Sequence, residues 1–264
     1  MDGIWQDIER IRAAAPLVHS ITNYVVMNTT ANALLAIGAS PVMAHAPEEV
    51  EEMAALSGAL VLNIGTLSAP WVDSMLKAGR AANGKGIPVV LDPVGSGATR
   101  FRTGSAKLLV REIRPAIVRG NASEIRSLVL AAPGTRGVDS IHSSEESLGE
   151  ARRLSAEAGC VVSVSGATDL IVSGGSVTRV ANGHPLMTRV TGIGCAATAL
   201  TAAFAAVNPS YPHAAAHAMA VMGIAGEMAV EACSGPGSFE ALFLDALHNM
   251  RESDIVRRLK MRAD

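Results

Sequence analysis

A cysteine follows a Gly-x-Gly turn at the start of a long run of small apolar residues. In TGIGCAA (191–197), Gly192 and Gly194 permit positive φ and a close approach of the backbone. Backbone N–H groups of such a turn at a helix N-terminus form a concave site for an anion, either a phosphate in transfer or the pyrophosphate of a dinucleotide. The dinucleotide fingerprint follows a first strand and precedes an acid about twenty residues on. Neither condition holds here, and a plain helix cap is the remaining alternative.

Cys195 falls in the first turn of the predicted helix. The helix dipole lowers the pKa of a thiol at that place, so Cys195 could accept a proton or act as a nucleophile. A small buried side chain is an equally good interpretation, because free cysteines are usually buried. Cys160, at the start of an apolar strand, and Cys233, on a predicted helix, are interpreted as packing residues. Three cysteines in a chain without a signal peptide predict reduced thiols and a cytoplasmic protein.

Two carboxylates follow predicted strands. Asp92 ends the strand in LDPVGSGA (91–98), and Glu124 lies three residues after Asn121 at a helix start in GNASEI (120–125). Such residues can simply cap a helix. Hard oxygen donors at neighbouring strand ends also suit a Mg²⁺ ion that keeps several waters. Mg²⁺ and an anion site are two recurring parts of phosphoryl transfer, and Arg119 could add positive charge beside a nucleotide phosphate.

The remaining chemistry-bearing residues give weaker signals. His213 and His217 have the i, i+4 spacing of a zinc pair but lack a third ligand candidate. His19 lies in an apolar strand and is predicted to be a core histidine. Met43, at a strand end, could line a pocket.

The elements that must position these residues alternate between strand and helix. Strands are predicted at 17–22, 40–45, 59–65, 115–121, 160–166, 169–175 and 176–181, and 87–97 is predicted as a strand that runs into a Gly-rich turn. Helices are predicted at 4–14, 23–39, 46–58, 68–86, 106–114, 122–132 and 143–159, and from Cys195 onward. This alternation predicts a three-layer α/β/α fold with a mostly parallel sheet, in which ligands bind at the carboxyl ends of the strands. A VSGG turn predicts a hairpin at one edge.

Composition sets the outer limits. The 264 residues include 49 % hydrophobic but only 3 % aromatic residues, so the core must be packed from aliphatic side chains. The segment 131–140 reads as a loop, and one domain over 1–264 is predicted. The net charge of −2 is dispersed and forms no basic stripe, which argues against nucleic-acid binding. RRLKMR (257–262) is interpreted as a solvated helix end, and no apolar run reaches the ~18 residues of a membrane span.

Six segments carry a family resemblance. They are 21–50, 60–68, 89–103, 118–125, 190–195 and 235–247, and in this order they resemble hydroxyethylthiazole kinases of the ribokinase-like superfamily. The resemblance implies a ribokinase-like kinase domain. It also implies phosphorylation of the primary hydroxyl of 4-methyl-5-(2-hydroxyethyl)thiazole for thiamine salvage, with ATP as co-substrate and Mg²⁺ as cofactor. A homotrimer with active sites at subunit interfaces is implied as well.

The resemblance also assigns residues. It places the thiazole at Met43, Gly192 and Asn23, ATP at Arg119, Ser165 and Gly194, and Mg²⁺ at Asp92 and Glu124, partly through water. Cys195 stands where related kinases carry an aspartate base. Ile193 replaces the usual threonine of the turn, and Ser165 stands where threonine is common. The alternatives are another ribokinase-like kinase such as a hydroxymethylpyrimidine kinase, a catalytically weakened ligand-binding homologue, or a Rossmann oxidoreductase.

Overall fold

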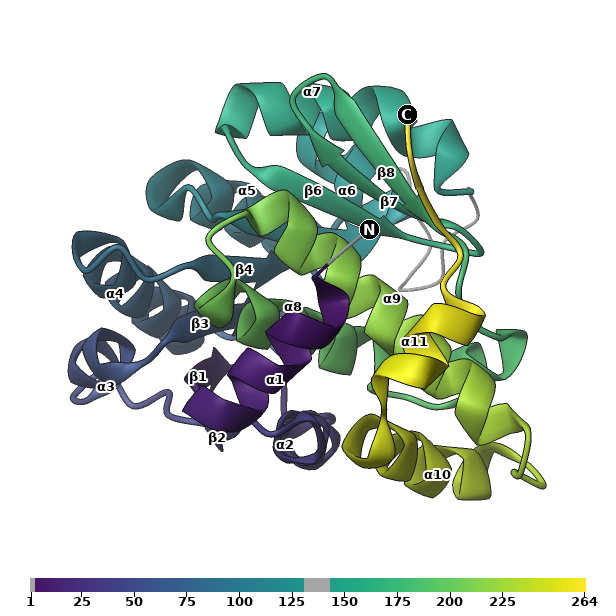
Figure 1. Ribbon diagram of the computed structural model, residues 1–264. Coiled ribbons are helices and arrows are strands. Elements are labelled where there is room, and N and C mark those ends of the chain that lie inside the picture. The colour runs from purple at the N-terminus through teal and green to yellow at the C-terminus, as the bar shows by residue number, and fades with distance from the viewer. Residues whose placement is uncertain (1–2, 131–142) are drawn as a thin grey trace.

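The computed structural model describes residues 3–130 and 143–264, whose strands form one nine-stranded sheet of order β2-β1-β3-β4-β5-β6-β7-β8-β9 (Figure 1). The strands are β1 (Leu17–Ile21), β2 (Ser40–Val42), β3 (Ala59–Asn63), β4 (Val89–Asp92), β5 (Ile117–Asn121), β6 (Val161–Ser165), β7 (Asp169–Ser173), β8 (Ser176–Val180) and β9 (Met261–Ala263). Pairing is parallel from β2 through β6 and antiparallel from β6 through β9. The predicted mostly parallel sheet is confirmed.

Helices cover both faces of the sheet, as the two-sided apolar strands require. One face packs on α1 (Ile4–Ala14), α2 (Met27–Ile37), α8 (Ile193–Val207), α9 (Tyr211–Val230), α10 (Pro236–Asn249) and α11 (Glu252–Arg258). The other packs on α3 (Val50–Leu56), α4 (Ala69–Gly84), α5 (Arg100–Ile113), α6 (Ala122–Val129) and α7 (Leu148–Ala158). The 3₁₀ turns η1 (Glu145–Ser147) and η2 (Pro185–Arg189) complete the described elements. The predicted three layers are present.

Strand alternation divides the apolar side chains between two cores. Val61, Val90 and Ile117 belong to the core under α8 and α9, whereas Leu60 and Leu91 belong to the core under α3 to α7. Successive side chains of a strand point to opposite faces, so every second residue shares a face. The polar residues Asn63 of β3, Asp92 of β4 and Arg119 of β5 share the phase of Val61, Val90 and Ile117 and can therefore be assigned to the α8 face.

Local capping explains where several helices begin and end. Gly38 ends α2 with φ 105°, as its sequence position predicted. Helix α5 starts at Arg100, earlier than the predicted residue 106, because the Thr99 hydroxyl accepts a hydrogen bond from the backbone N–H of Arg102. Gly174 makes the predicted hairpin turn between β7 and β8 with φ 56°.

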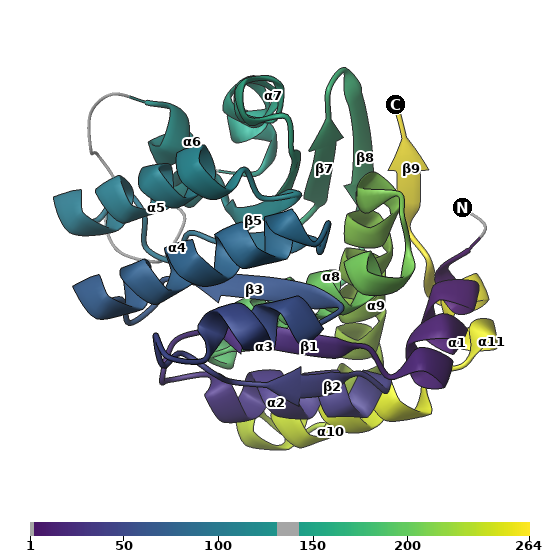
Figure 2. The same cartoon turned by 90° about the vertical axis from the view of Figure 1, so that its left-hand side faces the viewer.

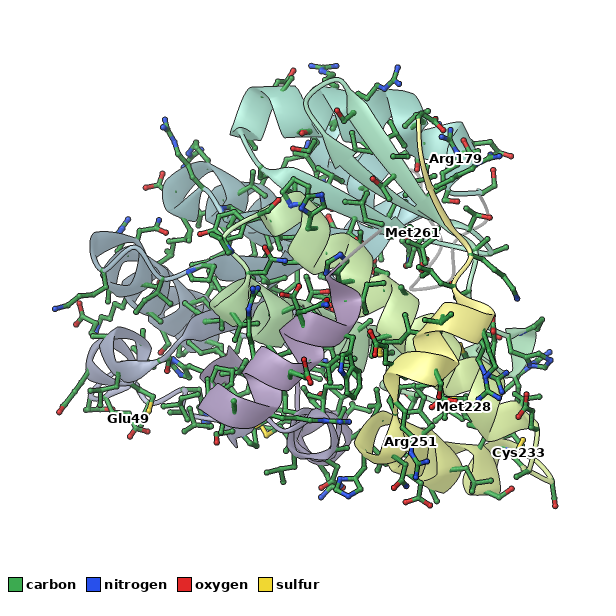
Figure 3. All side chains as sticks on the ribbon, viewed as in Figure 1. Glu49, Arg179, Met228, Cys233, Arg251 and Met261 are labelled. Atoms are coloured by element: carbon green, nitrogen blue, oxygen red, sulfur yellow. The ribbon has the colours of Figure 1, made fainter. Side chains whose placement is uncertain are left out.

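Two predictions about the C-terminal third are wrong. Residues 257–262 are not simply a solvated helix end, because α11 stops at Arg258 and Met261–Ala263 pair antiparallel with β8 (Figure 2). Cys233 lies beyond the end of α9 rather than on a helix, in the turn before α10 (Figure 3). The predicted loop 131–140 lies outside the described residues. No helix in the described ranges has the length and apolarity to cross a membrane.

Candidate active site

The polar residues on the α8 face form a row across the sheet at its carboxyl edge. The register pairs Asn63 with Asp92, and its continuation brings Asp92 opposite Arg119. Arg119 is in turn paired with Ser163 of β6. This row lies under the first turns of α8, so the fold gathers an amide, a carboxylate and a guanidinium beneath the Gly-rich turn.

A chain of buried hydrogen bonds joins the first strand to the helix. Asn23 Nδ2 donates to Asn63 Oδ1 at 2.8 Å and lies 3.6 Å from Cys195 Sγ. Asn63 Nδ2 donates to Asp92 Oδ2 at 3.1 Å, and Thr198 Oγ1 donates to the same oxygen at 2.6 Å. The structure thus brings together the three sequence-predicted residues Asn23, Asp92 and Cys195.

The thiol of Cys195 is not activated in the way its helix position suggested. Burial and, second, the neighbouring Asp92 carboxylate raise its pKa to about 12, although Asn63, Arg119 and Asn23 oppose this. The expectation that the helix dipole lowers this pKa is therefore wrong, because desolvation dominates. Cys195 is a neutral thiol at pH 7 in this structure.

Glu124 is held where α6 begins. Its Oε2 accepts the backbone N–H of Asn121 at 2.8 Å and its Oε1 accepts the N–H of Gly95 at 2.8 Å. Asn121 Oδ1 accepts the N–H of Glu124 in return, which completes a capping box. The capping interpretation of this pair is thus confirmed, and the Gly95 contact also ties Glu124 to the loop after β4.

The Glu124 and Asp92 carboxylates interact in a dry environment. Burial raises the pKa of Glu124 to about 7, with the Asp92 charge as the next cause, and burial raises the pKa of Asp92 to about 6. Two buried carboxylates whose charges oppose each other form a hard-oxygen set suited to a divalent cation. No group of three or more His, Cys, Asp or Glu side chains in the described ranges could hold a metal, so any ion here would keep water ligands.

The Gly-rich turn approaches the polar row closely. Gly192 has φ 90° at the start of α8, and a Cβ there would lie 3.3 Å from Val26 Cγ1. A Cβ on Gly194 would lie 3.2 Å from Arg119 Nη1. Glycine at these positions lets the backbone of the turn approach α2 on one side and the guanidinium on the other.

A cavity of about 700 Å³ opens beside this turn. Its polar end is lined by Arg119, Ser165, Asp169 and Gly192 to Gly194. Its apolar end, against α9, is lined by Met187, Met219, Met222 and Gly223 together with Asn182 and Gly183, whereas Val190 and Ala197 flank the turn. Arg119 is 8 % exposed, and its Nε has no hydrogen-bond partner among the described residues. A guanidinium that is mostly buried at a cavity wall beside a glycine turn can pair with an anion that enters the cavity.

Other predicted residues lie apart from this cavity. Met43 directly follows the edge strand β2 and does not line the cavity. His19 is a core histidine as predicted, since its buried Nε2 is 2.7 Å from the Ala44 carbonyl oxygen. His217 Nδ1 contacts the buried carboxylate of Asp7 at 2.7 Å, and the ring of His213 stacks on the ring of His217. The two histidines therefore belong to the packing of α1 on α9.

Three site residues were not singled out from the sequence: Asn63, Thr198 and Asp169. Asn63 and Asp92 both end apolar strands in the same phase, LVLN and VVLD, which is the signal that could have found Asn63. Asp169 is buried opposite Ser165, its Oδ1 accepts the Gly166 N–H at 2.9 Å, and burial raises its pKa to about 7. Thr198 gave no signal because small polar residues are common in a buried alanine-rich helix.

Comparison with known proteins gives one family. The model of the hydroxyethylthiazole kinase family matches residues 8–253. A hydroxyethylthiazole kinase of Oleidesulfovibrio alaskensis is 57 % identical over 96 % of this chain and 95 % of its own. One from Syntrophus aciditrophicus is 56 % identical over 98 % and 97 %, respectively.

Solved structures agree in fold. A hydroxyethylthiazole kinase structure from Pyrococcus horikoshii superposes with a TM-score of 0.92 at 44 % identity, covering 100 % of both chains. A pyridoxal kinase from Staphylococcus aureus bound to pyridoxal has a TM-score of 0.63 at 15 % identity, covering 94 % of this chain and 98 % of that one. At that identity the second structure supports the fold alone.

Proposed function

Since the chain belongs to the hydroxyethylthiazole kinase family, we propose that it phosphorylates the primary hydroxyl of 4-methyl-5-(2-hydroxyethyl)thiazole for thiamine salvage. The chain is a kinase of ribokinase-like fold. The single observation that carries the site assignment is the buried Arg119, which lines the polar end of a cavity and whose Nη1 lies beside Gly194 of the Gly192–Gly194 turn.

The cavity has the chemistry of a nucleotide site. Its apolar, methionine-rich end suits a flat base, because Met side chains adapt to aromatic rings. Its polar end offers Arg119, the Ser165 hydroxyl and the backbone of Gly194 to phosphate oxygens. A nucleotide bound in this direction has its terminal phosphate at the turn. A kinase structure of the same fold, the Staphylococcus aureus pyridoxal kinase, was solved with ADP.

The acceptor alcohol is proposed to dock beside the polar row. Asn23 and Gly192 lie there, next to the Cys195 thiol, and Met43 follows the edge strand as a more remote contact. Phosphoryl transfer has a loose transition state, so positioning and electrostatic stabilisation matter more than a strong base. The neutral thiol of Cys195 fits this description: it packs against the substrate position, and the backbone N–H groups of the turn stabilise charge on the moving group.

Mg²⁺ is the cofactor we propose, and Asp92 and Glu124 would hold it. Bound there, the ion would neutralise phosphate charge. The Asp92 and Glu124 carboxylates repel each other when both are charged, and their oxygens are hard ligands, so both properties support the assignment. The hydrogen bonds from Asn63 and Thr198 hold the Asp92 carboxylate in place.

The assembly proposed is a homotrimer of single kinase domains, 1–264, in the cytoplasm, with sites at the subunit interfaces. Tyr24 and Val25 directly follow Asn23 and are 63 % and 64 % exposed. Large apolar side chains this exposed at the rim of a site are typical of a surface that another chain covers.

The function is tested by incubating the purified protein with ATP, Mg²⁺ and the thiazole alcohol and measuring ADP and thiazole phosphate. Formation of both supports the proposal. Phosphorylation of hydroxymethylpyrimidine with no turnover of the thiazole would assign the chain to the other kinase of the pathway. Binding of either alcohol without release of ADP would show a ligand-binding homologue that has lost turnover.

A further inference from the structure

The wall of the nucleotide cavity contains an asparagine whose polar atoms are all engaged. Asn182 is buried, and Asn182 and Gly183 both line the cavity. Asn182 Nδ2 donates to Glu227 Oε1 at 3.2 Å and to the Arg258 carbonyl oxygen at 2.7 Å, while its Oδ1 accepts the Lys260 N–H at 2.8 Å. Side chains saturated in this way hold a fixed conformation, so this part of the wall is rigid.

Glu227 is the hub of this network. A single oxygen, Oε1, accepts from Asn182 Nδ2, from the backbone N–H of Gly183 at 3.0 Å and from Lys260 Nζ at 3.0 Å. The Glu227 side chain is mostly buried, whereas that of Lys260 is mostly exposed. The carboxylate itself does not line the cavity. It can therefore act on a ligand only through the two residues that do.

Helix α9 is shaped to receive the same segment. A Cβ on Gly223 would lie 2.5 Å from Asn182, and a Cβ on Gly226 would lie 2.5 Å from Met187 Sδ. Both glycines therefore let the cavity wall pack directly on the helix backbone, Gly223 one turn before Glu227 and Gly226 directly before it. Gly223 and Met187 themselves line the apolar end of the cavity. The wall that Glu227 holds is thus the part that would face the base.

The C-terminal strand completes the junction. Strands β8 and β9 pair at this edge of the sheet, where Figure 3 labels Arg179 in β8 and Met261 in β9. Ala181 N–H donates to the Lys260 carbonyl oxygen at 2.8 Å, immediately before Asn182. The segment between α11 and β9 therefore braces the cavity wall from outside.

We propose that Glu227 is a positioning residue for the nucleotide, which fixes Asn182 and Gly183 at the base end of the cavity and is braced by Lys260. The inference rests on the proposed function, because it takes the cavity as the ATP site. It predicts that loss of Glu227 weakens binding of the nucleoside part and leaves the chemical step intact.

The test compares Glu227→Ala with Glu231→Ala. Glu231 directly follows α9 and forms an ion pair with the Arg258 side chain, so its removal also cuts a tie to α11 but takes no hydrogen bond from Asn182. We expect Glu227→Ala to raise the KM for ATP about ten-fold or more, since three hydrogen bonds to one charged oxygen are lost. The kcat and the KM for the thiazole should stay within about two-fold. Glu231→Ala should leave all three constants near wild type.

A binding measurement separates the base end from the phosphate end. Calorimetric titration with ATP and with AMP should show both weakened by the same factor in Glu227→Ala, because the nucleoside part is common to them. In Arg119→Gln, ATP should be weakened more than AMP. Glu227→Gln keeps an acceptor oxygen and should recover most of the affinity, and Lys260→Met should cause a smaller loss than Glu227→Ala.

Several outcomes would overturn the inference. An unchanged ATP affinity in Glu227→Ala and Lys260→Met, with a wild type that turns over the thiazole, would refute it and leave the proposed function standing. A fall in kcat without a change in ATP affinity would also refute it. If Glu227→Ala fails to fold, Lys260→Met decides, and wild-type affinity for ATP in that variant counts against the inference. A folded wild type that binds neither ATP nor AMP would remove the proposed function along with it.

Discussion

Cys195 shows how the environment of one atom decides its chemistry. Its place in the first turn of α8 favours a thiolate, whereas burial beside Asp92 favours the thiol and raises the pKa to about 12. Burial is the largest cause, and the Asp92 charge adds to it more than Asn63, Arg119 and Asn23 oppose it. A residue that cannot accept a proton at neutral pH contributes by its size and position.

We therefore expect Cys195→Ala to reduce kcat by less than about ten-fold, well below the ~10²–10⁴-fold that loss of a general base costs. Cys195→Asp should stay active, since related kinases carry aspartate at this position. The measurement is kcat at saturating ATP and thiazole, with Cys233→Ala, outside the site, as the control. A folded Cys195→Asp variant without any activity would contradict this interpretation of the position.

Asp169 gives a prediction for the pH dependence of stability. Burial raises its pKa to about 7 in the folded chain, so the folded state binds a proton that the unfolded state releases near pH 4. The free energy of unfolding should therefore fall as the pH rises from about 4 to 7. Asp169→Asn keeps the acceptor for Gly166 and should remove this fall, gaining up to about 4 kcal/mol at pH 8 and nothing below pH 4.

Urea unfolding at pH 5 and pH 8 measures the effect, with the exposed Asp245→Asn as the matched control. Equal stabilisation of Asp169→Asn at both pH values would show that the carboxylate is not desolvated. A loss of stability at pH 8 would mean that its attraction to Arg119 outweighs burial.

At the scale of elements, the turn before α8 depends on backbone that only glycine adopts easily. Gly192→Ala would place a Cβ at φ 90° and 3.3 Å from Val26. We expect it to cost about 1–3 kcal/mol of stability and to reduce kcat at least ten-fold, since the N–H groups of the turn would shift. Gly149→Ala is the control, because Gly149 lies within α7 and a Cβ there meets nothing within 4 Å.

Gly149→Ala should raise stability by about 0.5–1 kcal/mol and keep full activity. Chemical denaturation and steady-state kinetics on the two variants measure both effects. Normal turnover in Gly192→Ala would show that the turn has no part in phosphate binding.

Helices and strands could be predicted from the sequence where apolar residues recur at regular spacing over a long segment. The alternation of buried strands and helices predicted the parallel part of the sheet, and Gly38 and Gly174 fixed a helix end and a hairpin. The three-residue β9 was not predictable, because its pairing with β8 depends on residues more than eighty positions away. Asp92, Arg119 and Glu124 could be predicted as site residues from the sequence. Asn63 could be recognised only once the pairing of β3 with β4 was known, and Asp169 only once the cavity was known.

At the scale of the whole molecule, the exposed side chains of Tyr24 and Val25 argue for assembly. Light scattering should give a mass of three chains of 27.2 kDa. The double variant Tyr24→Asp, Val25→Asp should have the mass of one chain, because two carboxylates would replace the apolar contact between chains. Its activity should be lower, because the site beside Asn23 would no longer be covered by a second chain. Leu56→Asp, an exposed position on α3, serves as the control and should leave the mass unchanged. A monomeric wild type with full turnover would contradict the proposed interface site.

The other edge of the sheet restricts how copies of this chain can meet. Strand β2 is only three residues long and contains Pro41, which has no N–H to offer a neighbouring strand. A second molecule therefore cannot readily lengthen the sheet at the β2 edge. Pro41 also disfavours edge-to-edge strand pairing between molecules while the chain folds, which is a route to aggregation for any open sheet.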